Sequence, residues 1–418
     1  MRKNNLSTLL ILAVSTALVF NACNKDLDPA VRMPPPPPNG QDNNNVVDNT
    51  PVDAIDPNDP PPGTYPAVTA MFGDRLNLNA LENYANQQRP GYINKDNAGN
   101  NPITNRGATL GRVLFYDKKL SINNTISCAS CHKQANAFGD NVIASTGVNG
   151  QTDRHAMRLV NARFSQETRF FWDERAASLE LQTTQPIQNH AEMGYSGQNG
   201  DPGIAELLVK LQAQDYYREL FTVTYGNEQV TEARLQTALS QFIRSIQSFD
   251  AKFDAGMAQV NNLNADFPNF TAQENSGKRL YLAPPPAGAG CQGCHRGPEF
   301  DIAPNSRNNG IVGIIGNTAA IDVNNTRAPS LRNLLNIASI PNGQFMHNGS
   351  ISTLAGVIDH YNNIPNVAGN NNLDNRLRPN GQPQNLNLSQ TEKDAIVAFL
   401  ATLSGNDVYT NTKWSDPF

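Results

Sequence analysis

The 418-residue sequence has little charge and no excess of positive charge. Only 17% of its residues are Asp, Glu, Lys or Arg, and 32 basic residues stand against 37 acidic ones. Without a basic stripe, nucleic acid is excluded as the expected partner. Few stretches alternate apolar and polar residues, so we expect little sheet and mainly helices. The apolar run over residues 9–20 is too short to cross a membrane as a mature helix.

That apolar run belongs to an N-terminal targeting segment. It follows two basic residues and ends in a small residue before Cys23. This pattern predicts a lipoprotein signal peptide over residues 1–22, with Cys23 as the acylated first residue of the mature chain. An ordinary signal peptide with an incidental cysteine is the alternative. We expect a lipoprotein of the periplasm or outer membrane of a Gram-negative bacterium, and Lys25-Asp26 resembles a Bacteroidetes surface-export signal.

The segment after Cys23 is poor in apolar residues and rich in proline and asparagine. It contains the proline runs 34–38 and 60–62. Such a segment buries too little surface to offset the entropy lost on ordering, and its prolines extend it. Residues 23–66 are therefore predicted to be a disordered tether that carries the rest of the protein on its lipid anchor.

The four remaining cysteines fall into two identical motifs. Both have the pattern C-x-x-C-H, and they consist of Cys128, Cys131 and His132 and of Cys291, Cys294 and His295. This is the attachment pattern of c-type haem, in which two thiols bind the haem covalently and the adjacent histidine ligates the iron. An exported chain suits this interpretation.

Other uses of paired cysteines fit less well. A zinc site has no need for a histidine directly after each pair. Thioredoxin-like chemistry requires a βαβ context that the sequence lacks, and disulfides of an exported protein do not explain the repeated histidine. We therefore predict two covalently bound haem c groups.

Helical signals occur in both halves of the chain. A helix after Thr231 would bury Leu235 and Leu239 on one face. A capping box over residues 389–392 opens a second helix, which Gly405 is expected to end. The prediction is a mainly α protein with two cytochrome-c-like helical domains, each holding one haem, over residues 67–255 and 256–418.

From about residue 105 to 405 the sequence resembles the bacterial dihaem cytochrome c peroxidase family, which includes the MauG enzymes. The stretches that carry the resemblance, besides the two motifs, are residues 114–117, 161–164, 171–175, 328–333 and 347–350.

The resemblance implies a role for each haem and for three side chains. The haem ligated by His132 would be peroxidatic, and the haem ligated by His295 would deliver electrons. Glu192 matches the catalytic glutamate, Gln182 the neighbouring glutamine, and Trp172 the tryptophan between the haems, at successive spacings of ten residues. The chemistry agrees, because peroxide must lose a proton at one oxygen and gain one at the other. Taken singly, Glu192 also fits a solvated loop charge and Trp172 an ordinary core residue.

Two positions depart from the better-known peroxidases. Where many of them place a second histidine over the resting peroxidatic haem, this chain has Val148, which cannot ligate iron. We therefore expect an open haem, with His155 and His190 as the nearby candidates for a substitute ligand. His155 also stands where the family usually has an asparagine of a calcium site, which argues against calcium here.

The sixth ligand of the second haem is the other open position. By the resemblance it falls on Tyr361, as in MauG; Met346, His360 or no residue are the alternatives. A phenolate would lower the reduction potential, whereas a methionine would raise it.

The leading functional hypothesis is an enzyme, a cytochrome c peroxidase that reduces hydrogen peroxide. Its electrons would come from a small donor protein, a cytochrome c or a cupredoxin. A MauG-like oxidase acting on a protein or organic substrate is the second hypothesis, and a non-enzymatic electron-transfer lipoprotein is the third. The resemblance also leaves a homodimer open.

Overall fold

The computed structural model describes residues 58–59, 63–302 and 304–418. The predicted signal peptide, the lipidation site Cys23 and most of the predicted tether lie outside these residues. At the end of the tether segment, the side-chain oxygen of Asn58 accepts a hydrogen bond from the backbone N of Asn105 at 3.1 Å. None of the helices in the described part of the chain is both long enough and apolar enough to span a membrane.

The described chain is mainly helical, as predicted. Its α-helices are α1 (Pro66–Phe72), α2 (Asn105–Tyr116), α3 (Cys128–Cys131), α4 (Leu179–Thr183), α5 (Ile204–Gln212), α6 (Asp215–Tyr225), α7 (Glu232–Ser245), α8 (Lys252–Val260), α9 (Ala272–Leu282), α10 (Leu354–Asn362), α11 (Gln390–Ala401) and α12 (Asp407–Thr410). Two small antiparallel sheets pair β1 (His295–Arg296) with β2 (Asp301–Ile302), and β3 (Gly313–Ile314) with β4 (Asn317–Ile321).

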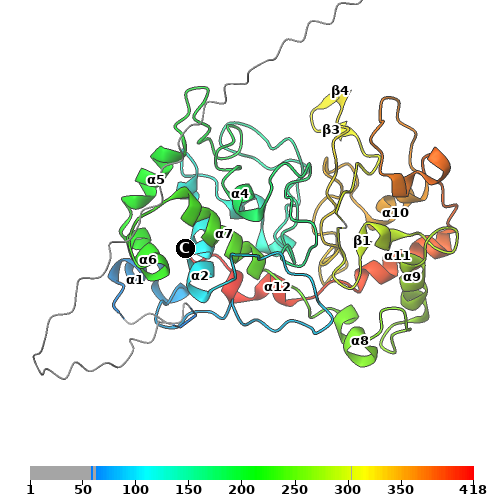
Figure 1. Ribbon diagram of the computed structural model, residues 1–418, viewed down its shortest axis with the longest axis horizontal. Helices are drawn as coiled ribbons and strands as arrows, with labels where there is room; N and C mark the ends of the chain where they lie inside the picture. Colours follow the sequence, from blue (N-terminus) through cyan, green and yellow to red (C-terminus); the bar gives the residue numbers. More distant parts are fainter. Residues whose placement is uncertain (1–57, 60–62, 303) are drawn as a thin grey trace, which may run out of the picture. The chain divides into compact units, whose positions relative to one another are not determined.

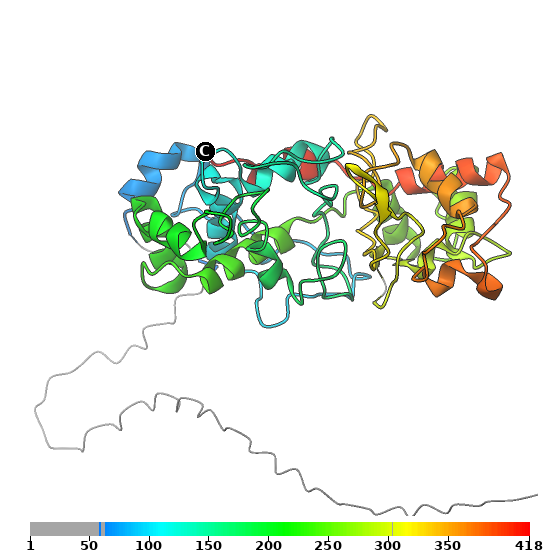
Figure 2. The ribbon, with the colours of Figure 1, turned by 90° about the horizontal axis from the view of Figure 1, so that it is seen from above.

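The first hydrophobic core is built around α2 and α7, which lie side by side in Figures 1 and 2. The side chain of Thr231 caps α7, and Leu235 and Leu239 are fully buried, as predicted. Gly111 on α2 permits the close crossing, because a Cβ there would lie 2.0 Å from the backbone oxygen of Ala238. Any larger residue at position 111 would push the two helices apart.

The second hydrophobic core is built around α9 and α11. The predicted capping box is present, with Ser389 and Glu392 bonded reciprocally at the start of α11. The predicted end of this helix at Gly405 is wrong, because α11 ends at Ala401. Gly405 has another reason to be a glycine: a Cβ there would lie 1.8 Å from Oδ1 of Asp250.

The C-terminal residues return to the first core. Val408 and Trp414 are fully buried there, and Trp414 Nε1 donates to Ser245 Oγ at 3.2 Å. In Figures 1 and 2 the chain accordingly ends beside α1 and α2. The two cores belong to one compact unit, and the domain boundary at residue 255 stays a prediction.

Candidate active site

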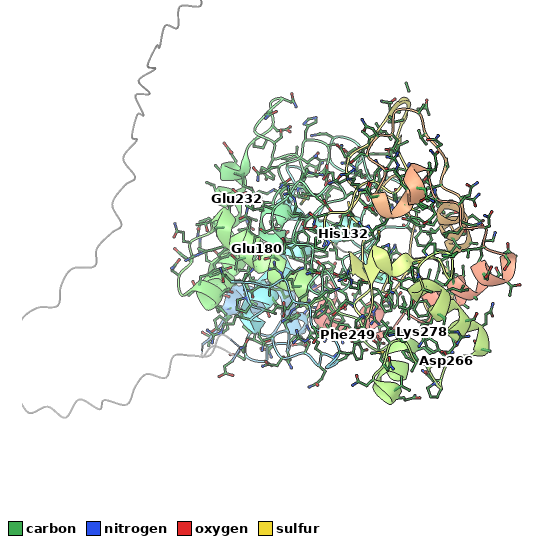
Figure 3. All side chains as sticks on the ribbon, turned by 45° about the vertical axis from the view of Figure 1, so that its right-hand side comes forward. His132, Glu180, Glu232, Phe249, Asp266 and Lys278 are labelled. Carbon is green, nitrogen blue, oxygen red and sulfur yellow. The ribbon has the colours of Figure 1, made fainter. Side chains whose placement is uncertain are left out.

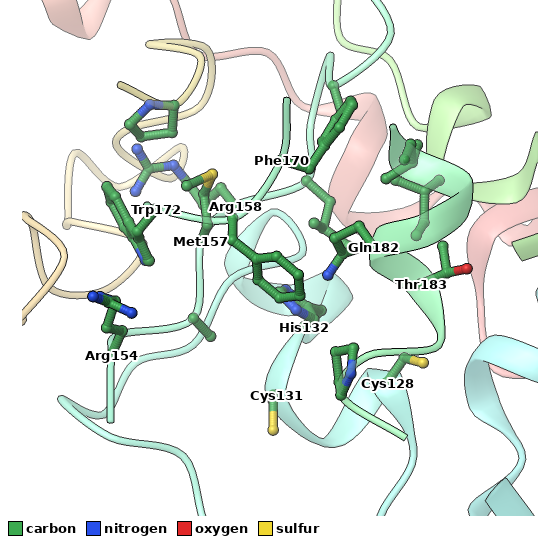
Figure 4. A pocket seen from close by; sticks show the side chains of 18 of the residues that line it. Cys128, Cys131, His132, Arg154, Met157, Arg158, Phe170, Trp172, Gln182 and Thr183 are labelled. Carbon is green, nitrogen blue, oxygen red and sulfur yellow. The ribbon is translucent and has the colours of Figure 1, made fainter. Parts of the chain in front are cut away.

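A cavity beside the first core contains the first cysteine motif. Helix α3 carries Cys128 and Cys131 to the wall of a space of about 1490 Å³ that opens to solvent. His132, directly after α3, lies near the middle of the body in Figure 3 and close to both cysteines in Figure 4. Gln182 and Glu192 line the same space. We call it the first cavity.

The ring of His132 is oriented by the backbone. Its Nδ1 lies 3.2 Å from the carbonyl oxygen of Phe138, and burial lowers the pKa of the imidazole. A neutral imidazole that uses Nδ1 for a carbonyl has Nε2 free for a metal. His132 is therefore prepared for the ligand role that its motif predicts.

Glu192 is held in the first cavity by a close backbone contact. The N–H of Val148 donates to the carbonyl of Glu192 at 2.9 Å. Position 147 must be glycine for this approach, since a Cβ there would lie 2.1 Å from the oxygen of Ala191. Burial raises the pKa of the Glu192 carboxyl to about 7, with a further increase from Asp153. A carboxyl with this pKa both accepts and donates protons near neutral pH.

Gln182 and Trp172 complete the predicted catalytic set. Gln182 lies on the short helix α4, and its amide points into the pocket in Figure 4. Trp172 lines the first cavity and also a second one. Its indole Nε1 donates to the carbonyl of His155 at 2.6 Å, and its own carbonyl accepts from the N–H of Arg327 at 2.6 Å. The structure thus brings together the three residues that the sequence spacing predicted.

The two candidates for a substitute ligand in place of Val148 differ in position. His155 lines the first cavity, and its Nδ1 lies 2.9 Å from the carbonyl of Val142. His190 is exposed, does not line this cavity and pairs with Asp201 at 2.7 Å. Of the two, His155 is therefore the one that the structure places at the first cavity.

The second motif lines a second cavity, also of about 1490 Å³, beside the second core. Burial lowers the pKa of His295 to about 4, which keeps its imidazole neutral and able to ligate a metal. Burial raises the pKa of Cys291 to about 12 and that of Cys294 to about 11. Reactive redox thiols have lowered pKa values, so these raised values argue against thioredoxin-like chemistry.

Both leading candidates for the sixth ligand line the second cavity. The side-chain amide of Asn309 lies 3.2 Å from the hydroxyl of Tyr361 and 3.3 Å from Sδ of Met346. One amide therefore contacts both candidates. His360 is turned elsewhere, with Nε2 bonded to the Asn309 carbonyl at 2.9 Å, and it does not line the cavity. Of the three candidate residues, Tyr361 and Met346 are therefore the two that line the cavity, and the identity of the sixth ligand stays a prediction.

One wall is common to both cavities, and we call it the shared wall. It consists of residues 155–158, Trp172 and residues 327–329, all of which line both spaces. Figure 4 shows its members Met157, Arg158 and Trp172 together on one side of the first cavity. A group bound in either cavity therefore meets the same side chains.

Comparison with known proteins agrees with this arrangement. Residues 105–262 match the model of the di-haem cytochrome c peroxidase family. Cytochrome c551 peroxidase of Nitrosomonas europaea is 31% identical over 313 residues, which are 72% of this chain and 80% of that protein. The chain belongs to the di-haem cytochrome c peroxidase family.

Other relatives within this di-haem peroxidase family carry a different name. The methylamine utilization protein MauG of Methylophilus methylotrophus is 29% identical over 315 residues, covering 73% of this chain and 84% of that protein. The crystal structure of a MauG-like protein associated with microbial copper homeostasis is 29% identical, with a TM-score of 0.62, and covers 79% of this chain and 99% of that chain. The family resemblance inferred from the sequence is confirmed.

Membership of the di-haem peroxidase family implies two c-type haems, and the donor sets fit them. Each cavity has two cysteines and a neutral histidine on its wall. The four thiols are free of disulfides. Within the described residues, no cluster of three or more His, Cys, Asp and Glu side chains is arranged to hold a metal ion by itself. Both cavities therefore suit a haem, in which the porphyrin supplies most of the ligands of the iron.

Sequence patterns did not reveal several residues of this di-haem site. Asn309, Gly147, Arg158 and Arg327 stand outside any motif. Arg327 directly precedes the family stretch 328–333, which was the single available signal. The others are brought to the cavities by tertiary contacts.

Proposed function

We propose that this protein reduces hydrogen peroxide to water, taking two electrons and two protons for each peroxide. The observation that carries the proposal is Glu192, a buried carboxyl with a pKa of about 7 in the same cavity as His132. Haem iron supplies the binding and reduction of peroxide when the cofactor is present. The protein supplies the proton transfers.

Glu192 and Gln182 have different roles at the substrate: the first transfers a proton and the second orients the peroxide. The carboxylate of Glu192 would take the proton from one peroxide oxygen and return it to the other, which would leave as water. The remaining oxygen would become the second water with the two electrons from the donor and two protons from solvent. The amide of Gln182 orients the peroxide or a pocket water. Asp153 and Arg175 line the same cavity and modulate the charge of Glu192.

The second cavity serves electron delivery in this proposal. Together with His295, Tyr361, or Met346 as the alternative, would hold the iron of this haem, which would then exchange electrons and bind no substrate. A small donor protein, a cytochrome c or a cupredoxin, supplies them, and Trp172 lies on the shared wall along their route. This division assigns acid–base chemistry to one cavity and electron transfer to the other.

A MauG-like oxidase is the second candidate function. Tyr361 as ligand and the absence of a histidine at position 148 favour it, as does the similarity to proteins named MauG. In that case the oxidised protein withdraws electrons from a protein or organic substrate. A non-enzymatic electron relay has less support, because a relay does not need a buried acid–base group beside an open iron.

The surroundings of the enzyme complete the proposal. Acylation at Cys23 makes the chain a periplasmic or outer-membrane lipoprotein, with the peroxidase body carried on its tether. Calcium is left out, because His155 replaces the expected asparagine and its ring engages the Val142 carbonyl. A homodimer is an additional proposal that rests on the family alone.

Peroxide titration of the purified holoprotein tests the choice between the functions. With a reduced donor cytochrome, fast peroxide consumption matched by donor oxidation supports the peroxidase. A long-lived oxidised spectrum with little turnover supports the MauG-like function. Peroxide that leaves the spectrum unchanged would contradict both. Intact mass, with a gain of two haems over the polypeptide, shows that the tested protein is fully loaded.

A further inference from the structure

The shared wall contains two arginines, Arg158 and Arg327, that form no ion pair within 4.0 Å with any described carboxylate. We propose that Arg158 and Arg327 bind the propionate groups of both haems and thereby link the reduction potentials of the two cofactors. The inference rests on the two haems of the family and goes beyond the proposed function. It concerns how the cofactors are held, not how peroxide reacts.

Arg158 extends between the two cavities and lines both of them. Its stem passes over Gly139, where a Cβ would lie 2.8 Å from Cγ of Arg158. Its Nε is buried and has no hydrogen-bond partner. Within the described residues, no ion pair to this guanidinium is formed at distances up to 4.0 Å. The Phe345 ring lies 6.0 Å away.

Arg327 lies on the opposite segment of the shared wall. Its backbone N–H bonds to the carbonyl of Trp172, and its side chain is 6% exposed. The guanidinium lies 4.4 Å from the ring centroid of Phe170, and one nitrogen donates to Ser165 Oγ at 3.3 Å. Its Nε is also buried without a partner. Glu167, Glu174 and Asp301 act on this guanidinium from a distance, but among the described residues none of them forms an ion pair with it within 4.0 Å.

Two cations without an ion pair beside the cavities favour the binding of an anionic group there. Burial lowers the pKa of both guanidinium groups to about 10, so they remain charged at neutral pH. A charge withdrawn from water without a partner is unfavourable, and a paired carboxylate largely offsets this cost. Each haem carries two propionates, and the planar guanidinium, with five N–H donors, matches carboxylates in a bidentate manner. Because both arginines line both cavities, each has donors available for either haem.

The other arginines of the cavities each line one cavity only: Arg154 and Arg175 line the first, and Arg307 and Arg376 line the second. Arg175 lines the first cavity alone, is 42% exposed and pairs with Asp173 at 2.8 Å. Arg307 lines the second cavity alone and is exposed. They provide one matched control for each haem.

The test measures the midpoint potential of each haem in the holoprotein by spectroelectrochemical titration. In Arg158→Met and Arg327→Met, both potentials should fall, because a positive charge near iron favours the ferrous state. A tenfold change in the ferric-to-ferrous ratio corresponds to about 59 mV. Arg175→Met and Arg307→Met should shift at most one haem, and by less. Resonance Raman bands of the propionates should change for both haems in the two shared-wall variants.

Arg158→Lys and Arg327→Lys keep the charge and lose the bidentate fork. Their reduction potentials should stay near those of the parent protein, while the propionate bands still shift. This result would separate the effect of the positive charge from that of the bidentate contact. The Lys variants also keep the proposal testable if the Met variants fold poorly. Unchanged potentials and unchanged propionate bands in the shared-wall variants would overturn the proposal, and so would a shift confined to one haem. Peroxide turnover is not the readout, so a loss of peroxidase activity leaves this result independent.

Discussion

The two cavities are alike on the walls that carry the cysteine motif and Trp172, and they differ on the remaining side. Each has a C-x-x-C-H motif on one wall, a neutral histidine, and the shared wall with Trp172. In the first cavity the remaining side contributes Gln182 and Glu192, and its acid–base group titrates near neutral pH. In the second cavity it contributes Tyr361 and Met346, side chains able to ligate a metal. On our proposal, the same attachment chemistry supports an open site in one half and a closed site in the other.

We infer from this difference that the C-x-x-C-H motif specifies the cofactor. The residues on the opposite side of each cavity, which we call the distal residues, specify what the cofactor does. The distal residues reach the two cavities by different means. A glycine at position 147 permits the backbone contact that carries Glu192, whereas α10 carries Tyr361. The predictions below test how far the two cavities can be made to exchange properties.

The largest effect is expected from Glu192→Gln. General acid–base groups contribute about 10²–10⁴-fold, so the rate of the peroxide reaction should fall by that amount while both haems stay attached. Stopped-flow absorbance with peroxide in excess measures this rate. Asp153→Asn, which alters an exposed carboxyl at the rim of the same cavity, is the matched control and should stay within a few-fold of the parent. A near-normal rate in Glu192→Gln would remove Glu192 from the mechanism.

The ligand of the second haem should respond to only one of two substitutions. If Tyr361 ligates the iron, Tyr361→Phe should open this haem to cyanide or transfer ligation to Met346, with a methionine-to-iron charge-transfer band and a higher potential. Met346→Leu should then leave the spectrum unchanged. Electron paramagnetic resonance of the oxidised protein distinguishes the two. The reverse pattern, with Met346→Leu as the disruptive change, would assign the ligand to Met346.

The pH dependence of the peroxide reaction should follow the titration of Glu192 in the first cavity. Glu192 is protonated below a pKa of about 7, and the carboxylate is the form that accepts a proton. The rate of the peroxide reaction should therefore rise about tenfold per pH unit below 7 and level off above it. Asp153→Asn removes a negative charge that raises this pKa, so the inflection should move to lower pH. An unchanged inflection in Glu192→Gln would show that another group titrates.

The smallest effect is expected from Gly147→Ala. The added Cβ would lie 2.1 Å from the Ala191 oxygen and 2.7 Å from the Cα of Glu192. Overpacking of this kind costs about 1–3 kcal/mol, and it should displace Glu192 and slow the peroxide reaction. Denaturant unfolding and the peroxide rate measure both effects. Gly150→Ala is the control, because its nearest neighbour is the Ala191 Cβ at 3.7 Å; equal losses in both variants would argue against the contact.

Much of the site followed from local pattern. The haem motifs, the spacing of Trp172, Gln182 and Glu192, and the capped helices are properties of neighbouring residues, so they were visible in the sequence. The end of α11 was predicted too late, because Gly405 meets the distant Asp250 instead of ending a helix. The same cause hid Asn309, whose amide contacts Tyr361 and Met346 from another part of the chain.

The sequence by itself determined the class of the protein. Two C-x-x-C-H motifs in a mainly helical chain predict two haems, since attachment needs only thiols and a histidine at a fixed short spacing. The tertiary structure alone decided which side chains face those positions, which histidines turn away, and which wall the two cavities share. Burial, charge and close backbone approach depend on segments far apart in the chain. For that reason the pKa of Glu192 and the unpaired charges of Arg158 and Arg327 emerged only after folding brought those segments together.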